Sequence, residues 1–167
     1  PDRLPFTCRR GTDGMFQRVL FATDFSEYAK KALDCVAGFP GVKEIILLHI
    51  LEEARSPRGG GEIHETLTPH EMCSLREEKN HLEKLVKDLK VTIEVRASSD
   101  TAGAILETAE EKGVPLIVVG ARGSSIVEGI LLGSVSMAII RRSKMNVLVM
   151  RHKITEGLTG KTYDMTC

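Results

Sequence analysis

Residues 116–142, LIVVGARGSSIVEGILLGSVSMAIIRR, carry the strongest structural signals in the chain. The apolar run Leu116–Val119, bounded by a proline and a glycine, is typical of a short buried strand. Ser134–Arg142 has the apolar periodicity of a helix, and its two terminal arginines suit the negative end of the helix dipole. A buried strand that leads into a helix is the repeating unit of an α/β sheet.

Glycines stand where this strand ends and where the helix begins. Gly120 and Gly123 follow the strand, and Gly133 precedes Ser134, which we expect to cap the helix. Glycine lets backbone approach a ligand closely, and the free N–H groups of a helix N-terminus attract anions. The spacing therefore indicates a phosphate cradle built from two separated pieces of backbone. Ordinary turns and a helix cap are the alternative, because glycine motifs alone are weak signals.

The rest of the chain alternates between strand and helix patterns. Apolar or alternating runs predict strands at 18–22, 44–51, 91–95 and 147–150. Further helices are predicted after Ser26, after the capping box Thr68–Glu71 with an apolar stripe continuing through Leu89, and from the caps around Asp100 to Gly113. This order predicts a single, doubly wound, five-stranded parallel sheet flanked by four helices, a Rossmann-like α/β fold.

One domain is expected, since 167 residues with 42% hydrophobic content suffice for one core and are short for two. We place it at 17–153, with a long flexible loop at 52–68. Stretches without core patterning are expected to form an N-terminal extension and a C-terminal tail, at 1–16 and 154–167.

Charge and cysteine content restrict the function classes. Lys+Arg and Asp+Glu both total 23, so no global field draws the chain to nucleic acid or to a membrane. The four cysteines form no CxxC pair, which argues against a zinc site and a disulfide framework. No signal-peptide layout or membrane-length apolar run is present. These features together predict a cytoplasmic protein.

In open α/β sheets, ligands bind beyond the carboxyl ends of the strands. A carboxylate there, such as Asp24, can accept hydrogen bonds from a ribose or an adenine edge, although a turn or cap role is the alternative. Backbone near Ile50 can contact adenine, and backbone N–H groups and the serine hydroxyl of the cradle can hold phosphates. The candidate residues at the three strand ends and in the cradle are Ala22, Thr23, Asp24, Ile50, Val119, Gly120, Gly123, Gly133, Ser134 and Val135.

Three stretches of the chain together resemble the universal stress protein family. Ala22–Ser26 (ATDFS) is similar to the family's first-strand signature, and 45–50 to its second strand. The Gly-x2-Gly-x9-Gly-Ser pattern, with 130–136 (ILLGSVS), is similar to its phosphate turn, which adds Ser136 to the candidates. Two turns depart from the family pattern, at Asn146, where the family often has Pro, and at 99–101.

The resemblance implies that the chain binds ATP, with Mg²⁺ or Mn²⁺ held through the phosphates and not by protein ligands. It also implies a homodimer, here expected through the strand at 147–150. We predict that Arg122 in the glycine loop reaches the outer phosphates, because guanidinium suits phosphate geometry; a solvent-directed arginine is the alternative.

Catalysis has little support in the sequence. A GxxxxGK[ST] loop is absent, which excludes a Walker-type ATPase, and no residue is placed as an evident base. We therefore expect a nucleotide-dependent sensor or regulator in a stress response, with an unknown regulatory protein partner. Two alternatives stay open: a weak ATP hydrolase, and a dimeric interaction module that holds no nucleotide.

Overall fold

The computed structural model describes residues 16–52, 67–121 and 132–151. The predicted extension, central loop and tail fall wholly or almost wholly outside these ranges. So do Arg122 and Gly123, together with the first part of the phosphate turn, and their predicted roles remain predictions.

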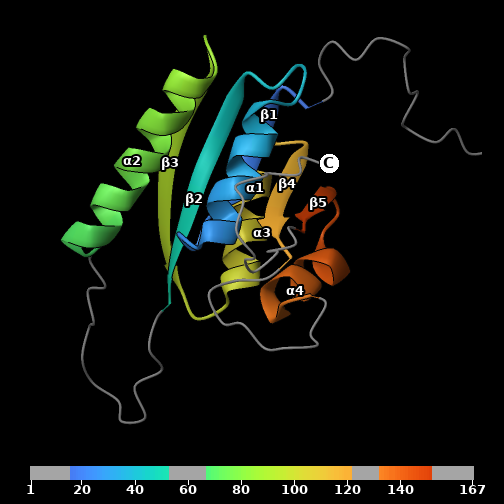
Figure 1. The fold of residues 1–167 in the computed structure, drawn as a ribbon. Coiled ribbons are helices and arrows are strands. Elements are labelled where there is room, and N and C mark those ends of the chain that lie inside the picture. The colour runs from blue at the N-terminus through green and yellow to red at the C-terminus, as the bar shows by residue number, and fades with distance from the viewer. Residues whose placement is uncertain (1–15, 53–66, 122–131, 152–167) are drawn as a thin grey trace, which may run out of the picture.

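Strands and helices alternate along the described chain, in the order that the sequence pattern predicts. The strands form one parallel sheet in the order β3-β2-β1-β4-β5, with helices on both faces (Figure 1). This arrangement confirms the predicted fold class. The strands are β1 (Arg18–Ala22), β2 (Glu44–Glu52), β3 (Lys90–Ser98), β4 (Leu116–Gly120) and β5 (Asn146–Met150), and the helices are α1 (Glu27–Ala37), α2 (Pro69–Leu85), α3 (Thr101–Lys112) and α4 (Ser134–Arg142).

Two apolar clusters, one on each face of the sheet, hold the helices in place. On one face α1 and α2 pack against the sheet, with Leu33 and Leu75 fully buried. On the other face α3 and α4 do so, with Ile105 and Ile139 buried. The central strands supply side chains to both clusters, which explains their nearly continuous apolar sequences.

Helix caps confirm most of the predicted helix starts. Ser26 caps α1, Thr68 and Glu71 form the full capping box of α2, and Asp100 caps α3 through the Gly103 N–H. Gly113 ends α3 in the left-handed conformation, with φ of 59°. A glycine adopts this conformation without a steric penalty.

The end of α2 differs from the prediction. The helix stops at Leu85, which is 52% exposed, and the chain then turns at Asp88, whose φ is positive at 63°. Leu89 is buried, but it leads into β3 and does not extend a helical stripe. The apolar residues after Leu85 therefore belong to a turn and to the approach to a strand, a change of period that the sequence pattern concealed.

The amino ends of the strands are joined by an ion-pair ladder across β1, β2 and β3. Glu44 Oε2 lies 2.8 Å from Arg18 Nε, and Glu44 Oε1 lies 2.9 Å from Lys90 Nζ. The hydrogen bond from Lys90, with a further one from Arg18, lowers the pKa of Glu44. Arg18 also donates to the carbonyl of Lys112 at the end of α3. This edge is structural and lies opposite the carboxyl ends of the strands. Within the described ranges, no helix combines the length and hydropathy needed to cross a bilayer.

Candidate functional site

The strand order reverses between β1 and β4, and the two strands part at their carboxyl ends. They pair only as far as Phe21 and Val118. β1 continues to Ala22 beside β2, while β4 continues to Gly120 beside β5. The chain leaves β1 for a helix on one face and leaves β4 for a helix on the other. This is the topological switch point at which open α/β sheets bind ligands.

The end of β4 is joined directly to the start of α4. The Gly133 N–H donates to the Ala121 carbonyl over 2.7 Å, and the Ser136 hydroxyl donates to the Gly120 carbonyl over 2.6 Å. Ala121 in turn donates to Met150 at the end of β5. Gly120 and Ala121 at the end of β4 therefore lie beside Gly133 and Ser136 at the start of α4.

The N-terminus of α4 differs from the prediction in its capping residue. Gly133, not Ser134, is the N-cap, and no side chain caps this helix. The first amide paired within the helix is that of Met137, which donates to the Gly133 carbonyl. The amides of Ser134, Val135 and Ser136 precede that bond, and no hydrogen bond joins them to another described element. Three N–H groups at a positive dipole end can therefore receive an anion.

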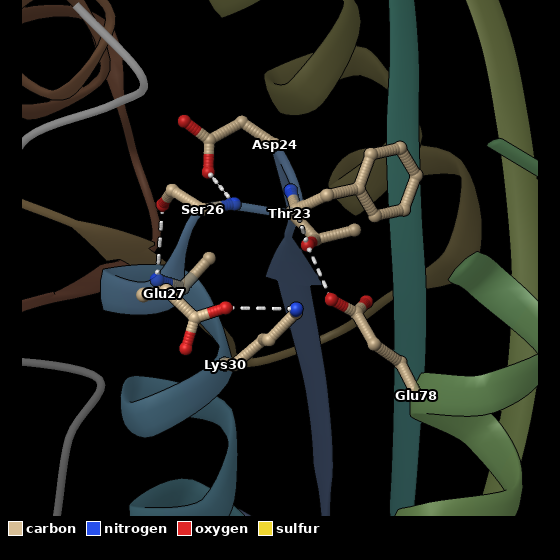
Figure 2. Close-up of polar contacts among 8 residues, drawn as sticks. Thr23, Asp24, Ser26, Glu27, Lys30 and Glu78 are labelled. Atoms are coloured by element: carbon tan, nitrogen blue, oxygen red, sulfur yellow. Dashed lines mark hydrogen bonds and ion pairs between the residues drawn. The ribbon is translucent and has the colours of Figure 1, made fainter. Parts of the chain in front are cut away.

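The turn between β1 and α1 presents Asp24 at the same edge of the sheet. Asp24 is exposed; its Oδ1 accepts the Ser26 N–H over 3.1 Å, and Oδ2 has no partner among the described residues. Phe25 has a φ of 61°, which is unusual for a bulky side chain. Such backbone strain persists only where surrounding contacts enforce it, and it clusters at functional sites. Figure 2 shows the Asp24 carboxylate directed away from the neighbouring helix α2.

Thr23 is the residue that holds this turn. Its N–H donates to the Leu48 carbonyl over 2.9 Å, and its carbonyl accepts from His49 Nδ1 over 3.1 Å. Its hydroxyl accepts the Phe25 N–H and donates to Glu78 Oε1 (Figure 2). Every polar atom of Thr23 is therefore bonded within the protein. The residue is only 6% exposed, and the ligand contact that the sequence predicts for it remains a prediction.

Ile50 lies on β2 beyond the point where β1 ends. The Leu48 carbonyl accepts from Thr23, so the N–H and C=O groups of Leu48 point toward β1. The direction of these groups alternates from one residue to the next along a strand, so those of Ile50, two residues on, also point toward the β1 side. At that level β1 has already ended and the chain has turned toward α1. His49 has a structural role here: its ring donates to the Thr23 carbonyl and contacts the Phe25 ring, at 4.4 Å between centroids.

Glu78 was missed by sequence reasoning. It lies on α2, where seven of the 17 residues are charged, and nothing in its spacing separates it from its exposed neighbours. In the fold it is 6% exposed, bonded to Thr23 over 3.3 Å, and its Oε2 is buried without a partner in the described chain. Burial raises the pKa of Glu78 to about 7.

The predicted site residues thus fall into two groups on neighbouring strands. Gly120, Gly133, Ser134, Val135 and Ser136 surround the start of α4; Ala22, Thr23 and Asp24 end β1, with Ile50 beside them on β2. The Val119 side chain is buried in the core, so only its backbone faces this edge. Gly123 and Arg122 lie outside the described residues. Among those described, no three His, Cys, Asp or Glu side chains gather as metal ligands.

Comparison with known proteins identifies a family for nearly the whole domain. Residues 15–151 match the universal stress protein family. The universal stress protein MJ0577 of Methanocaldococcus jannaschii is 32% identical over 157 residues, which cover 83% of this chain and 97% of that protein. The universal stress protein YxiE of Bacillus subtilis is also 32% identical, over 82% of this chain and 100% of its own length.

Solved structures of universal stress proteins share the fold of this chain. The fold of MJ0577 matches with a TM-score of 0.71 at 31% identity, covering 84% of this chain and 99% of that one. A universal stress protein in complex with cAMP matches with a TM-score of 0.59 at 25% identity, covering 81% and 97%.

Proposed function

This chain belongs to the universal stress protein family, and from that premise we propose that it binds an adenine nucleotide, ATP first among them, where β1 and β4 part. The start of α4 is the observation that carries this proposal. Its first three amides, which have no partner among the described residues, stand at a helix N-terminus beside the end of β4, and no described side chain competes for them.

In this proposal some residues of the site contact the nucleotide and others hold the contacting residues in place. The amides of Ser134, Val135 and Ser136, with the Ser134 hydroxyl, hold the phosphates, and Gly123 and Arg122 complete that half of the site. Asp24 Oδ2 accepts from the ribose or the adenine edge, and the Ile50 backbone contacts adenine. Supporting residues hold the contacts in place and are bonded within the protein: Thr23, Gly133 and Ser136 through its hydroxyl.

The family comparison favours an adenine nucleotide over other anions. A relative of the same fold was solved in complex with cAMP, which joins an adenine to a phosphate. The two groups of residues suit these two parts of a nucleotide. The carboxylate and strand backbone on β1 and β2 can bind the adenine side, and the helix amides of α4 can bind the phosphate. Mg²⁺ or Mn²⁺ would be carried on the phosphates of ATP.

We further propose that the protein works as a nucleotide-dependent sensor or regulator in the cytoplasm and not as an efficient enzyme. No described residue stands as a base beside the start of α4. A homodimer through β5 fits the sheet, because β5 is an edge strand whose Val147–Met150 side chains are only partly buried in the single chain.

Native mass spectrometry and thermal unfolding test the binding directly. We expect a dimer that carries adenine nucleotide, and a rise in Tm with millimolar Mg-ATP, because a ligand at one hundred times its Kd stabilises the fold by about 2.7 kcal/mol. An apo dimer with an unchanged Tm would support the nucleotide-free interaction module instead. Phosphate release at steady state, sensitive to Gly133→Val, would support the weak hydrolase.

Gly133→Asp separates loss of the site from loss of the fold. A carboxylate at this position caps α4 and satisfies its amides, so the apo protein should be as stable as the wild type or more so. The same carboxylate repels phosphate, so the Mg-ATP shift in Tm should vanish. Gly133→Asn is the matched control, since it caps without charge and should weaken binding less. An unchanged ATP response in Gly133→Asp would refute the role of α4.

A further inference from the structure

Glu78 is a buried carboxyl group that the proposed nucleotide contacts do not use. It projects from the middle of α2 toward the turn between β1 and α1 (Figure 2). Oε1 accepts from the Thr23 hydroxyl over 3.3 Å, and Oε2 is buried with no partner in the described chain. A buried carboxylate normally has a hydrogen bond to each oxygen or a paired cation, because an unpaired charge is costly to bury.

The surroundings of Glu78 favour its neutral form. Burial is the largest influence on its pKa and raises it, and the nearby charges of Asp24 and Asp34 act in the same direction. The hydrogen bond from the Thr23 hydroxyl and the Lys30 ammonium oppose them. Lys30, however, is already bonded to Glu27 over 2.9 Å. A neutral acid leaves one buried O–H group unpaired, whereas a carboxylate would leave part of a negative charge without a partner.

Glu78 is connected to the strained turn by a short chain of hydrogen bonds. Its carboxyl group accepts from the Thr23 hydroxyl, and that hydroxyl accepts the Phe25 N–H over 3.1 Å. Phe25 is the residue with positive φ, and Asp24 precedes it. The contacts of Thr23 therefore hold the unfavourable conformation that orients Asp24. Any movement of Glu78 acts on this turn first.

We propose that Glu78 is a positioning residue whose proton keeps the β1–α1 turn, and with it Asp24, in the conformation that receives a nucleotide. Loss of the proton places a charge where the Thr23 hydroxyl is the one hydrogen-bond donor among the described residues. Glu78 then turns toward the Lys30 ammonium or toward water. A carboxylate accepts more strongly than a neutral acid, so the Thr23 hydroxyl follows it and releases the Phe25 N–H, and the turn relaxes. The consequence for affinity rests on the proposed nucleotide function: binding weakens as the pH rises through neutrality.

Other charged groups around Glu78 are few and come from defined elements. α1 contributes Lys30 and Asp34, and the turn contributes Asp24. β2 contributes His49, which reaches the carbonyl of Thr23 and lies 3.7 Å from Glu71 on α2. The β3 residues that pack against this cluster, Ile93 and Val95, are apolar. His49 is thus the second ionisable side chain in contact with this turn, and its effect must be separated from that of Glu78.

A pH titration of the turn tests the proposal without nucleotide. In ¹H–¹⁵N spectra of the full chain, we expect the Phe25 and Ser26 amide resonances to shift with a midpoint near pH 7. The shift should be absent in Glu78→Gln and retained in Glu77→Gln, its exposed neighbour on α2. If the same shift appears in Glu78→Gln, it belongs to another group and the proposal is wrong.

Affinity measurements test the consequence. If only the protonated form binds, the Kd for Mg-ATP should rise about tenfold from pH 6 to pH 8 in the wild type relative to Glu78→Gln, because the competent fraction falls by that factor. Comparing the two proteins at each pH cancels the titration of ATP itself. Equal pH profiles would overturn the link to binding. If neither protein binds ATP at any pH, the proposed function fails, and the amide titration alone decides whether Glu78 holds the turn.

Discussion

Glu78→Gln should change how the stability of the fold depends on pH. The substitution keeps the size and the hydrogen-bonding oxygen that faces Thr23, but it removes the ionisable group. The pKa of Glu78 rises from its ordinary value of 4.5 to about 7 on folding, chiefly through burial. Between those values the folded chain holds a proton that the unfolded chain has lost, so the free energy of unfolding of the wild type falls as the pH rises.

The size of this effect follows from the two pKa values. Stability linked to the proton is fully present below the unfolded pKa and is lost as the pH passes the folded pKa. Between about pH 5 and pH 8 the loss amounts to about 2 to 3 kcal/mol for one group with these values. Glu78→Gln lacks this dependence. Relative to the wild type, the variant should therefore gain about 2 to 3 kcal/mol over that interval and be the more stable protein at pH 8.

Urea unfolding followed by circular dichroism measures the difference, since the chain contains no Trp for fluorescence. Wild type, Glu78→Gln and the exposed control Glu77→Gln should be compared at several pH values. Subtracting the curves removes every other titrating group that the proteins share. A difference between Glu78→Gln and wild type that is the same at pH 5 and pH 8 would show that Glu78 ionises normally and would refute the reasoning.

Three further substitutions test the scaffold. Gly103→Ala should lower Tm although Ala favours helix, because the new Cβ would lie 2.4 Å from Asp100 Oδ2 and displace the α3 cap. In an Asp100→Ser background the same substitution should raise Tm. A rise in Tm in both backgrounds would contradict the clash. Glu44→Gln should cost about 1 kcal/mol at pH 7, and because Lys90 lowers the pKa of Glu44, the difference from wild type should fade as the pH falls below 4.5 in urea titrations. Asp88→Gly should raise the free energy of unfolding by about 0.5 kcal/mol by relieving a positive φ; a loss of stability would show that Asp88 is held by contacts and not strained.

Local signals in the sequence predicted most of the scaffold. Ser26, the Thr68–Glu71 box and Asp100 begin helices as expected, because a cap depends only on residues within one turn. The exceptions are instructive. Gly133 caps α4 in place of Ser134, because two suitable capping residues are adjacent in the sequence. Helix α2 ends at Leu85, before the sequence pattern suggests, because the apolar run continues across a turn.

The sequence predicted where the candidate site lies, but not which of its polar groups are already bonded within the protein. The glycine spacing pointed to α4, and strand ends pointed to Asp24 and Ile50. The sequence offered no sign that all polar atoms of Thr23 are bonded internally, or that the Ser136 hydroxyl is given to the Gly120 carbonyl. A residue type shows which bonds it can make; only its neighbours in space show which bonds are already made.

The sequence by itself determined the alternation of strands and helices, since periodicity and caps act over a few residues. Tertiary structure decided which strand ends lie together: β4 lies beside β1, so the end of β4 shares an edge of the sheet with Asp24. It also brought Gly133 at the start of α4 back to Ala121. It also brought Glu78 to Thr23, 55 residues away in the chain. Burial by the packed helix and sheet, which no local pattern records, turns an ordinary surface-type glutamate into a group poised to hold a proton near neutrality.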